Sequence, residues 1–200
     1  VMHRLFITLA LACIGLSVTA QKYTVQSIRE RYNAVHEVMQ QMTPDKDGET
    51  MLPKEYIDLD VYQNLPGTGG HNERIRLWYG YLEDGDDVIY PPRCLSFASS
   101  KYNYAAREFY EEYLYDQKGN LLFIYVKTPD VEGSNMYPYE LRLWMDGKRL
   151  LRFSAKNHEG KDEYTGTKIP EQFQSEVDRV KDRGAQLLEM FKGLDKAVLL

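Results

Sequence analysis

Between residues 55 and 155, apolar and polar side chains alternate in one short segment after another. Ile57, Leu59 and Val61 are separated by single aspartates, and the same alternation returns at residues 139–145. Successive side chains of a strand point to opposite faces of a sheet, so this period of two predicts half-buried β-strands. The pattern confines the central part of the chain to folds built on a β-sheet.

Short turn sequences separate these segments and predict antiparallel hairpins. Residues 117–120 read Gln-Lys-Gly-Asn, and Asp146 is followed by Gly147. Asp-Gly between alternating segments is among the strongest short hairpin signals. Strands joined by tight turns lie beside their sequence neighbours. We therefore expect a twisted antiparallel meander of six to eight strands over residues 55–155.

Two segments outside the meander have the period of a helix. In residues 24–42 and 170–194, apolar side chains recur every three or four positions. Thr24 is placed to cap the first helix, and Pro170 opens the second, where a missing N–H is tolerated. Gly184 lies on the apolar stripe of the second helix, where it either allows a close approach to the sheet or merely weakens the helix.

These elements together predict an α+β fold. An antiparallel sheet with one apolar face must cover that face, and the two helices are the available covers. We expect one domain over residues 21–200, with the N- and C-terminal helices packed on one side of the meander. A lipocalin-like barrel with the C-terminal helix packed outside is the alternative.

The first twenty residues resemble a secretory signal peptide. Arg4 precedes an apolar stretch over residues 5–16, and Val18 and Ala20 are small residues suited to the positions before a cleavage site. We expect cleavage before Gln21 and a periplasmic or secreted protein. A lipoprotein anchored at Cys13 is the minority alternative, because Cys13 follows a small residue.

The charge balance excludes some partners. The chain has 25 Lys and Arg against 30 Asp and Glu, for a net charge of −5. Binding to nucleic acid or to anionic lipid needs a basic surface, which this composition does not favour. After residue 20 the sequence has no apolar run long enough for a membrane span. We expect a small molecule, a glycan or another envelope protein as the partner.

Sequence motifs give no catalytic residue, metal site or cofactor. The chain lacks the glycine-rich phosphate loops, the G-x-S-x-G nucleophile motif and the histidine spacing of zinc sites. One enzymatic alternative remains, a hydrolase whose carboxylate and histidine site is built from loops 63–72 and 155–168. His71 and His158 would supply its imidazoles.

The polar faces of the predicted strands hold the best candidate site. Counting by two places Arg76, Trp78, Arg142 and Trp144 on the face opposite the apolar core, with both tryptophans pointing away from that core. Tyr110 and Glu112 join them from the intervening strand. Aromatic rings beside Arg and Glu suit a sugar or an organic anion. We expect a non-enzymatic domain that binds a ligand or a protein with this face, and a lipocalin-like carrier is a further alternative.

Two hairpin segments also carry a resemblance. Residues 113–123 read Tyr-Leu-Tyr-Asp-Gln-Lys-Gly-Asn-Leu-Leu-Phe, and residues 139–144 read Tyr-Glu-Leu-Arg-Leu-Trp. These segments resemble hairpins in uncharacterised exported proteins of Gram-negative gut bacteria. The resemblance implies export, and it implies no activity or functional residue.

Overall fold

A computed structural model describes residues 23–41, 55–82, 91–129, 139–157 and 162–198. It contains two helices, α1 (Val25–Gln41) and α2 (Glu171–Ala197). The strands are β1 (Glu55–Leu65), β2 (Gly69–Tyr81), β3 (Arg93–Tyr104), β4 (Arg107–Tyr115), β5 (Leu121–Lys127), β6 (Tyr139–Asp146), β7 (Arg149–Asn157) and β8 (Asp162–Gly166). The helices and strands expected from the sequence are therefore present.

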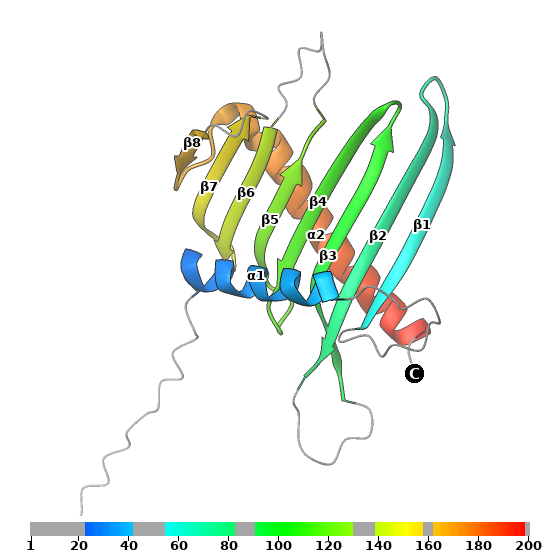
Figure 1. Cartoon of the computed structure of the whole chain (residues 1–200), viewed down its shortest axis with the longest axis horizontal. Coiled ribbons are helices and arrows are strands. Elements are labelled where there is room, and N and C mark those ends of the chain that lie inside the picture. The colour runs from blue at the N-terminus through cyan, green and yellow to red at the C-terminus, as the bar shows by residue number, and fades with distance from the viewer. Residues whose placement is uncertain (1–22, 42–54, 83–90, 130–138, 158–161, 199–200) are drawn as a thin grey trace, which may run out of the picture.

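The eight strands form one antiparallel meander in sequence order, β1 to β8 (Figure 1). This confirms the predicted α+β fold class. β1 and β8 are the two edges of an open sheet, so the barrel alternative is wrong for this chain. The sheet also continues past residue 155 through the short strand β8.

The two helices cover opposite faces of the sheet. Figure 1 shows α1 crossing in front of the strands near one end and α2 running diagonally behind them. Two separate apolar clusters agree with this arrangement, one packed on each helix. The expectation that both helices pack on one side is therefore wrong. Its physical reason is that the strands carry large apolar side chains on both faces.

The larger cluster lies between the sheet and α2, on what we call the α2 face. Phe173, Val177, Val180, Leu187 and Phe191 of the helix are buried there. The strands contribute side chains that alternate as the sequence predicts, and the most buried are Leu77, Ala98, Tyr113, Ile124, Val126, Leu141, Leu143, Phe153 and Ala155. This face is the core expected from the period of two.

Gly184 allows α2 to approach the sheet closely. A Cβ atom at this position would lie 3.0 Å from side-chain carbons of both Tyr113 and Leu121. The Tyr115 hydroxyl also donates a hydrogen bond of 2.7 Å to the Gly184 carbonyl. The sequence placed this glycine on the apolar stripe, and the contacts confirm that the helix and sheet meet there.

Substituting alanine at two glycines of α2 is expected to have different effects. Gly193 has no atom within 4 Å of an added Cβ, so Gly193→Ala should stabilise the protein by up to about 1 kcal/mol through helix propensity. Gly184→Ala gains the same propensity but overpacks the core, which typically costs about 1–3 kcal/mol. Urea unfolding of the two variants measures the difference. Equal stability would show that the close approach at Gly184 is not tight.

A second cluster lies between the sheet and α1, on what we call the α1 face. Thr24 and Ser27 cap the helix reciprocally, because the Ser27 N–H donates to Thr24 Oγ1 at 3.1 Å and the Thr24 N–H donates to Ser27 Oγ at 3.0 Å. Ile28 is completely buried beneath the helix. The buried strand residues of this cluster are Trp78, Phe97, Leu114, Leu122, Phe123 and Trp144.

Both tryptophans lie on the face opposite the predicted core, as the alternation indicates. They are nevertheless buried, because Trp78 is 1% exposed and Trp144 is 5% exposed. The expectation of an exposed tryptophan face is therefore wrong, since α1 covers it. Rings that are covered in this way offer no open stacking platform for a sugar.

Three bulges interrupt the alternation at the end of the sheet that α1 covers. The register moves by one residue at Ser96, Leu122 and Leu151, each of which is extra in its strand. As a result Trp144 lies opposite Arg152 rather than opposite Leu151. The bulge in β7 thus decides which side chain stands beside Trp144.

Candidate functional site

Residues opposite one another in register form two rows across the α1 face. The apolar row, from β1 to β7, is Tyr56, Trp78, Phe97, Leu114, Phe123, Trp144 and Arg152. The polar row beside it is Asp58, Arg76, Ser99, Glu112, Tyr125, Arg142 and Ser154. Because α1 packs over the apolar row, the polar row lies alongside the helix. The candidate site lies where these rows meet.

At the β1–β2 end, the polar row is a closed ion pair. Arg76 donates two hydrogen bonds of 2.6 Å to the carboxylate of Asp58, and its guanidinium lies over the Tyr56 ring at 4.5 Å. The hydrogen bonds that Arg76 donates to Asp58 raise the pKa of Arg76. Each charge here already has a partner, so this end of the row is a stabilising cross-strand pair.

At the centre, Glu112 joins α1 to the sheet. It is 3% exposed and accepts hydrogen bonds from the hydroxyls of Tyr32 at 2.5 Å and Tyr110 at 2.7 Å. His36 of α1 also lies near it, with Nε2 3.4 Å from Glu112 Oε1. Burial is the main cause that raises the pKa values of Tyr32 and Tyr110, and the negative charge of Glu112 raises them further. Both phenols therefore keep their protons.

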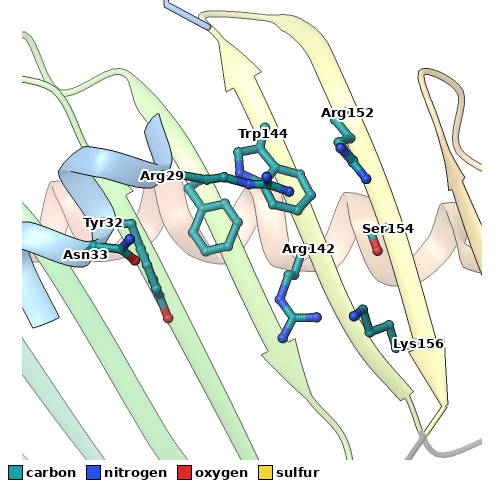
Figure 2. A pocket seen from close by; sticks show the side chains of 9 residues that line it. Arg29, Tyr32, Asn33, Arg142, Trp144, Arg152, Ser154 and Lys156 are labelled. Atoms are coloured by element: carbon teal, nitrogen blue, oxygen red, sulfur yellow. The ribbon is translucent and has the colours of Figure 1, made fainter. Parts of the chain in front are cut away.

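At the β6–β7 end, the face is hollowed into a cavity of about 370 Å³. We call it the cationic pocket, and Figure 2 shows the residues that line it: Arg29, Tyr32 and Asn33 from α1, Phe123 from β5, Arg142 and Trp144 from β6, and Arg152, Ser154 and Lys156 from β7. Its volume falls in the range of small-molecule sites.

The charged side chains that line the cationic pocket all have the same sign. Of the described residues that line it, four are cationic and none is acidic. Arg142 donates to Glu140, just outside the lining, at 2.7 Å. Within the described part of the chain, Arg29 and Arg152 form no ion pair with an acidic side chain. The pocket is therefore a concentration of positive charge in a chain of net charge −5.

Two buried donors in the cationic pocket are unused. Among the described residues, neither Arg142 Nη1 nor Arg152 Nε has a hydrogen-bond partner. The guanidinium carbons of Arg29 and Arg152 lie 5.3 and 5.7 Å from the centre of the Trp144 ring. Trp144 thus supports the cations through its π face. Within the described segments these two donors have no acceptor, so they are available to an acceptor on a ligand.

The six residues proposed from the sequence share one face, but they do not form one site. The structure places Arg142 and Trp144 in the cationic pocket. Arg76 and Trp78 lie at the far end of the rows, and Tyr110 and Glu112 lie in the central cluster. Sequence reasoning missed the pocket residues from α1 and β7, namely Arg29, Tyr32, Asn33, Arg152, Ser154 and Lys156.

Much of the first segment expected to form a loop of the hydrolase site is β-strand in the structure. Residues 63–65 and 69–72 belong to β1 and β2, and His71 is a strand residue whose Nδ1 lies 2.7 Å from the Asn103 carbonyl oxygen. His158 lies outside the described residues. Within the described segments, no group of three or more His, Cys, Asp or Glu side chains could hold a metal ion.

Comparisons with known proteins give no relative for this fold and pocket. No protein-family model matches the chain, and no curated protein or solved structure matches it. The resemblance of its hairpins to exported proteins therefore stays a prediction. Within the described residues, neither helix is long and apolar enough to cross a membrane.

Proposed function

We propose that this protein binds small organic anions in the cationic pocket and does so without chemical turnover. One observation carries the proposal: four cationic side chains converge on a cavity whose described lining has no acid. The proposal keeps the expectation of a ligand-binding sheet face. It moves the binding site to the β6–β7 end and to the edge of α1.

The energetic cost of this arrangement supports a binding role. Like charges that share a small cavity repel one another, and a buried donor without a partner costs about 1–3 kcal/mol. Arg142 Nη1 and Arg152 Nε are two such donors. An anion in the cavity would satisfy both donors and reduce the repulsion. Charge-assisted hydrogen bonds of this kind contribute about 1.5–3 kcal/mol each.

A charge-removing variant tests the proposal. Arg152→Gln takes one guanidinium from the cavity, and we expect the affinity for citrate or inorganic sulfate to fall at least about tenfold, equivalent to about 1.4 kcal/mol. Isothermal titration calorimetry at low ionic strength measures this loss, because salt screens charge–charge attraction. Raising the salt concentration should weaken binding to the unmodified protein as well.

Arg149→Gln is the matched control. Arg149 is on the same strand and bears the same charge, but it is 50% exposed and paired with Asp146 at 2.7 Å, outside the cationic pocket. We expect this variant to bind both anions within twofold of the unmodified protein. Equal losses in the two variants would indicate a diffuse charge effect, and no saturable binding of either anion would contradict the proposal.

We also propose that the protein is exported, with Gln21 as the mature N-terminus. The support is the order of a charged residue, an apolar stretch and small residues in the first twenty positions. Mass spectrometry of the protein from a cell envelope or culture supernatant tests this. A mass that includes Cys13 and an acyl group would support the lipoprotein alternative instead.

A further inference from the structure

The cations of the cationic pocket are not equally available to a ligand. Arg142 is paired with Glu140 at 2.7 Å, and Lys156 lies opposite the same glutamate in the β6–β7 register and already interacts with the protein. In the part of the chain that the structure describes, Arg29 and Arg152 have no acidic partner. The positive charge left for a ligand to neutralise is therefore that of two guanidinium groups.

These two guanidinium groups meet at one aromatic ring. Arg29 comes from α1 and Arg152 from β7, and their guanidinium carbons lie 5.3 and 5.7 Å from the centre of the Trp144 ring. Figure 2 shows Arg29 extending from the helix to Trp144 and Arg152 beside the same ring. Because like charges repel, two cations held at one ring favour a single group that carries two negative charges.

The free donors of the pocket belong to different residues on two strands. The Nη1 atom of Arg142 and the Nε atom of Arg152 are buried and, among the described residues, lack a partner. Ser154 lies opposite Arg142, two positions after Arg152, and adds a hydroxyl group to the same lining. A carboxylate matches the planar fork of one arginine, whereas a phosphate group has three acceptor oxygens. Donors from several residues therefore favour a tetrahedral oxyanion.

The rest of the pocket suits a neutral organic body. The cavity of about 370 Å³ falls in the range of small-molecule sites, so it has room for more than one oxyanion group. Phe123 contributes an apolar ring to the lining, and Tyr32 and Asn33 of α1 add neutral polar groups. Apolar rings with a few polar groups between them are typical of sites for small organic molecules.

We infer that the ligand is a small phosphate monoester whose phosphate group lies between Arg29 of α1 and Arg152 of β7. A phosphate monoester is tetrahedral, has three strong acceptor oxygens and carries a charge of about −1.5 to −2 near pH 7. It would neutralise both unpaired guanidinium groups and accept from the free donor of Arg142. This inference rests on the proposed anion-binding function and specifies its ligand class.

Three phenyl compounds test the charge and the shape of the anionic group separately. Phenyl phosphate and phenyl sulfate are both tetrahedral esters, but the sulfate ester carries a single charge. Phthalate carries two charges on planar carboxylates. By isothermal titration calorimetry at pH 8 and low ionic strength, we expect phenyl phosphate to bind at least about tenfold more tightly than either compound. Inorganic phosphate, which lacks the organic body, should also bind more weakly than phenyl phosphate.

Lowering the pH provides a second test of the charge. The second proton of a phosphate monoester has a pKa of about 6, so most of the phenyl phosphate carries only one charge at pH 5. We expect its preference over phenyl sulfate to fall to about threefold or less. The sulfate ester keeps its charge over this range, so its affinity reports any change in the protein itself.

Variants of the two unpaired cations test the location of the phosphate group. In both Arg29→Gln and Arg152→Gln, the preference for phenyl phosphate over phenyl sulfate at pH 8 should fall to about threefold or less. Arg31→Gln on α1 and Arg149→Gln on β7 are the matched controls, because both positions lie outside the pocket lining. Both controls should keep the full preference. A preference retained in both Arg29→Gln and Arg152→Gln would overturn the inference.

The outcomes separate this inference from the proposed function. If phenyl sulfate, phthalate or inorganic phosphate binds as tightly as phenyl phosphate at pH 8, the phosphate monoester inference is wrong while anion binding stands. If neither citrate, sulfate, phosphate nor any of the phenyl compounds binds saturably, the proposed function itself is wrong.

Discussion

Replacing Glu111 with alanine is expected to lower the free energy of unfolding by about 2–6 kcal/mol, because two phenol donors lose their acceptor and each buried donor without a partner costs about 1–3 kcal/mol. Glu111 is 0% exposed on the α2 face. Its carboxylate accepts hydrogen bonds from the hydroxyls of Tyr102 at 2.9 Å and Tyr113 at 2.6 Å. Arg179 of α2 donates a third at 2.6 Å. Removing the carboxylate leaves the two phenols without their acceptor, while Arg179 keeps its hydrogen bonds to Glu176 at 2.7 and 2.8 Å.

Glu108→Ala is the matched control for this prediction. Glu108 is on the same strand, is 71% exposed and pairs with the exposed Lys101 at 3.3 Å. Exposed pairs contribute about 0–1 kcal/mol, so this variant should unfold at nearly the same urea concentration as the unmodified protein. Glu111→Gln keeps the oxygen acceptor and should lose less stability than the alanine variant. Similar small losses at positions 108 and 111 would contradict the prediction.

Raising the pH above about 10 is expected to destabilise the protein steeply, because buried tyrosines keep their protons in the folded state. Burial raises the pKa of Tyr113, with Glu111 adding to the effect, and burial also raises the pKa of Tyr115. In the unfolded chain both phenols ionise near pH 10. Above that pH the unfolded state binds fewer protons than the folded state, so stability falls as the pH rises.

The size of this alkaline effect follows from proton linkage. The contribution of each tyrosine is fully present below pH 10 and is lost at about 1.4 kcal/mol per pH unit as the pH rises toward the folded pKa. Tyr113 and Tyr115 together give about 3 kcal/mol per unit. Burial also raises the pKa of Tyr79, to about 12, which adds to the slope.

Urea unfolding between pH 9 and 11 measures this slope, and absorbance of the ionised phenol follows the tyrosines directly. Tyr115→Phe is the informative variant, because it removes one titrating group. At pH 8 it should be less stable than the unmodified protein, because the variant lacks the hydrogen bond from the Tyr115 hydroxyl to the Gly184 carbonyl. Its loss of stability per pH unit should be smaller by about 1.4 kcal/mol. An unchanged slope would contradict the assignment to buried tyrosines.

The meander could be predicted because its signals are local. Alternation at residues 139–145 fixes which side chains share a face, and Asp146-Gly147 fixes where the chain turns. The helix starts at Thr24 and Pro170 are local for the same reason. Positions of this kind depend on the few residues around them, so one sequence is enough to find them.

The position of α1 could not be predicted because it is not local. The apolar stripe of α1 could pack on any apolar surface. The alternation of the strands clearly identifies only the α2 face as apolar. Trp78 and Trp144 lie on the other face among Arg76 and Arg142, where the pattern suggests exposure. Large rings that share a strand face with arginines can therefore be recognised as buried only when the helix that covers them is already known.

Only part of the candidate site could be predicted, because the rest also depends on features that are not local. Arg142 and Trp144 follow from alternation within β6. Arg152 stands beside Trp144 only because the bulge at Leu151 moves the register by one residue. Arg29 reaches the pocket only because α1 lies on that face. The sequence lacks a local signal for either of these conditions.

Glu111 and Glu112 have a consequence for how this protein can change over time. These adjacent carboxylates are 0% and 3% exposed, and they face opposite layers. One binds Arg179 of α2, and the other binds Tyr32 of α1. A single-residue insertion or deletion just before them would exchange their faces and disturb both helix attachments at once. We therefore expect natural length variation to avoid this part of β4 and to accumulate in its hairpins instead.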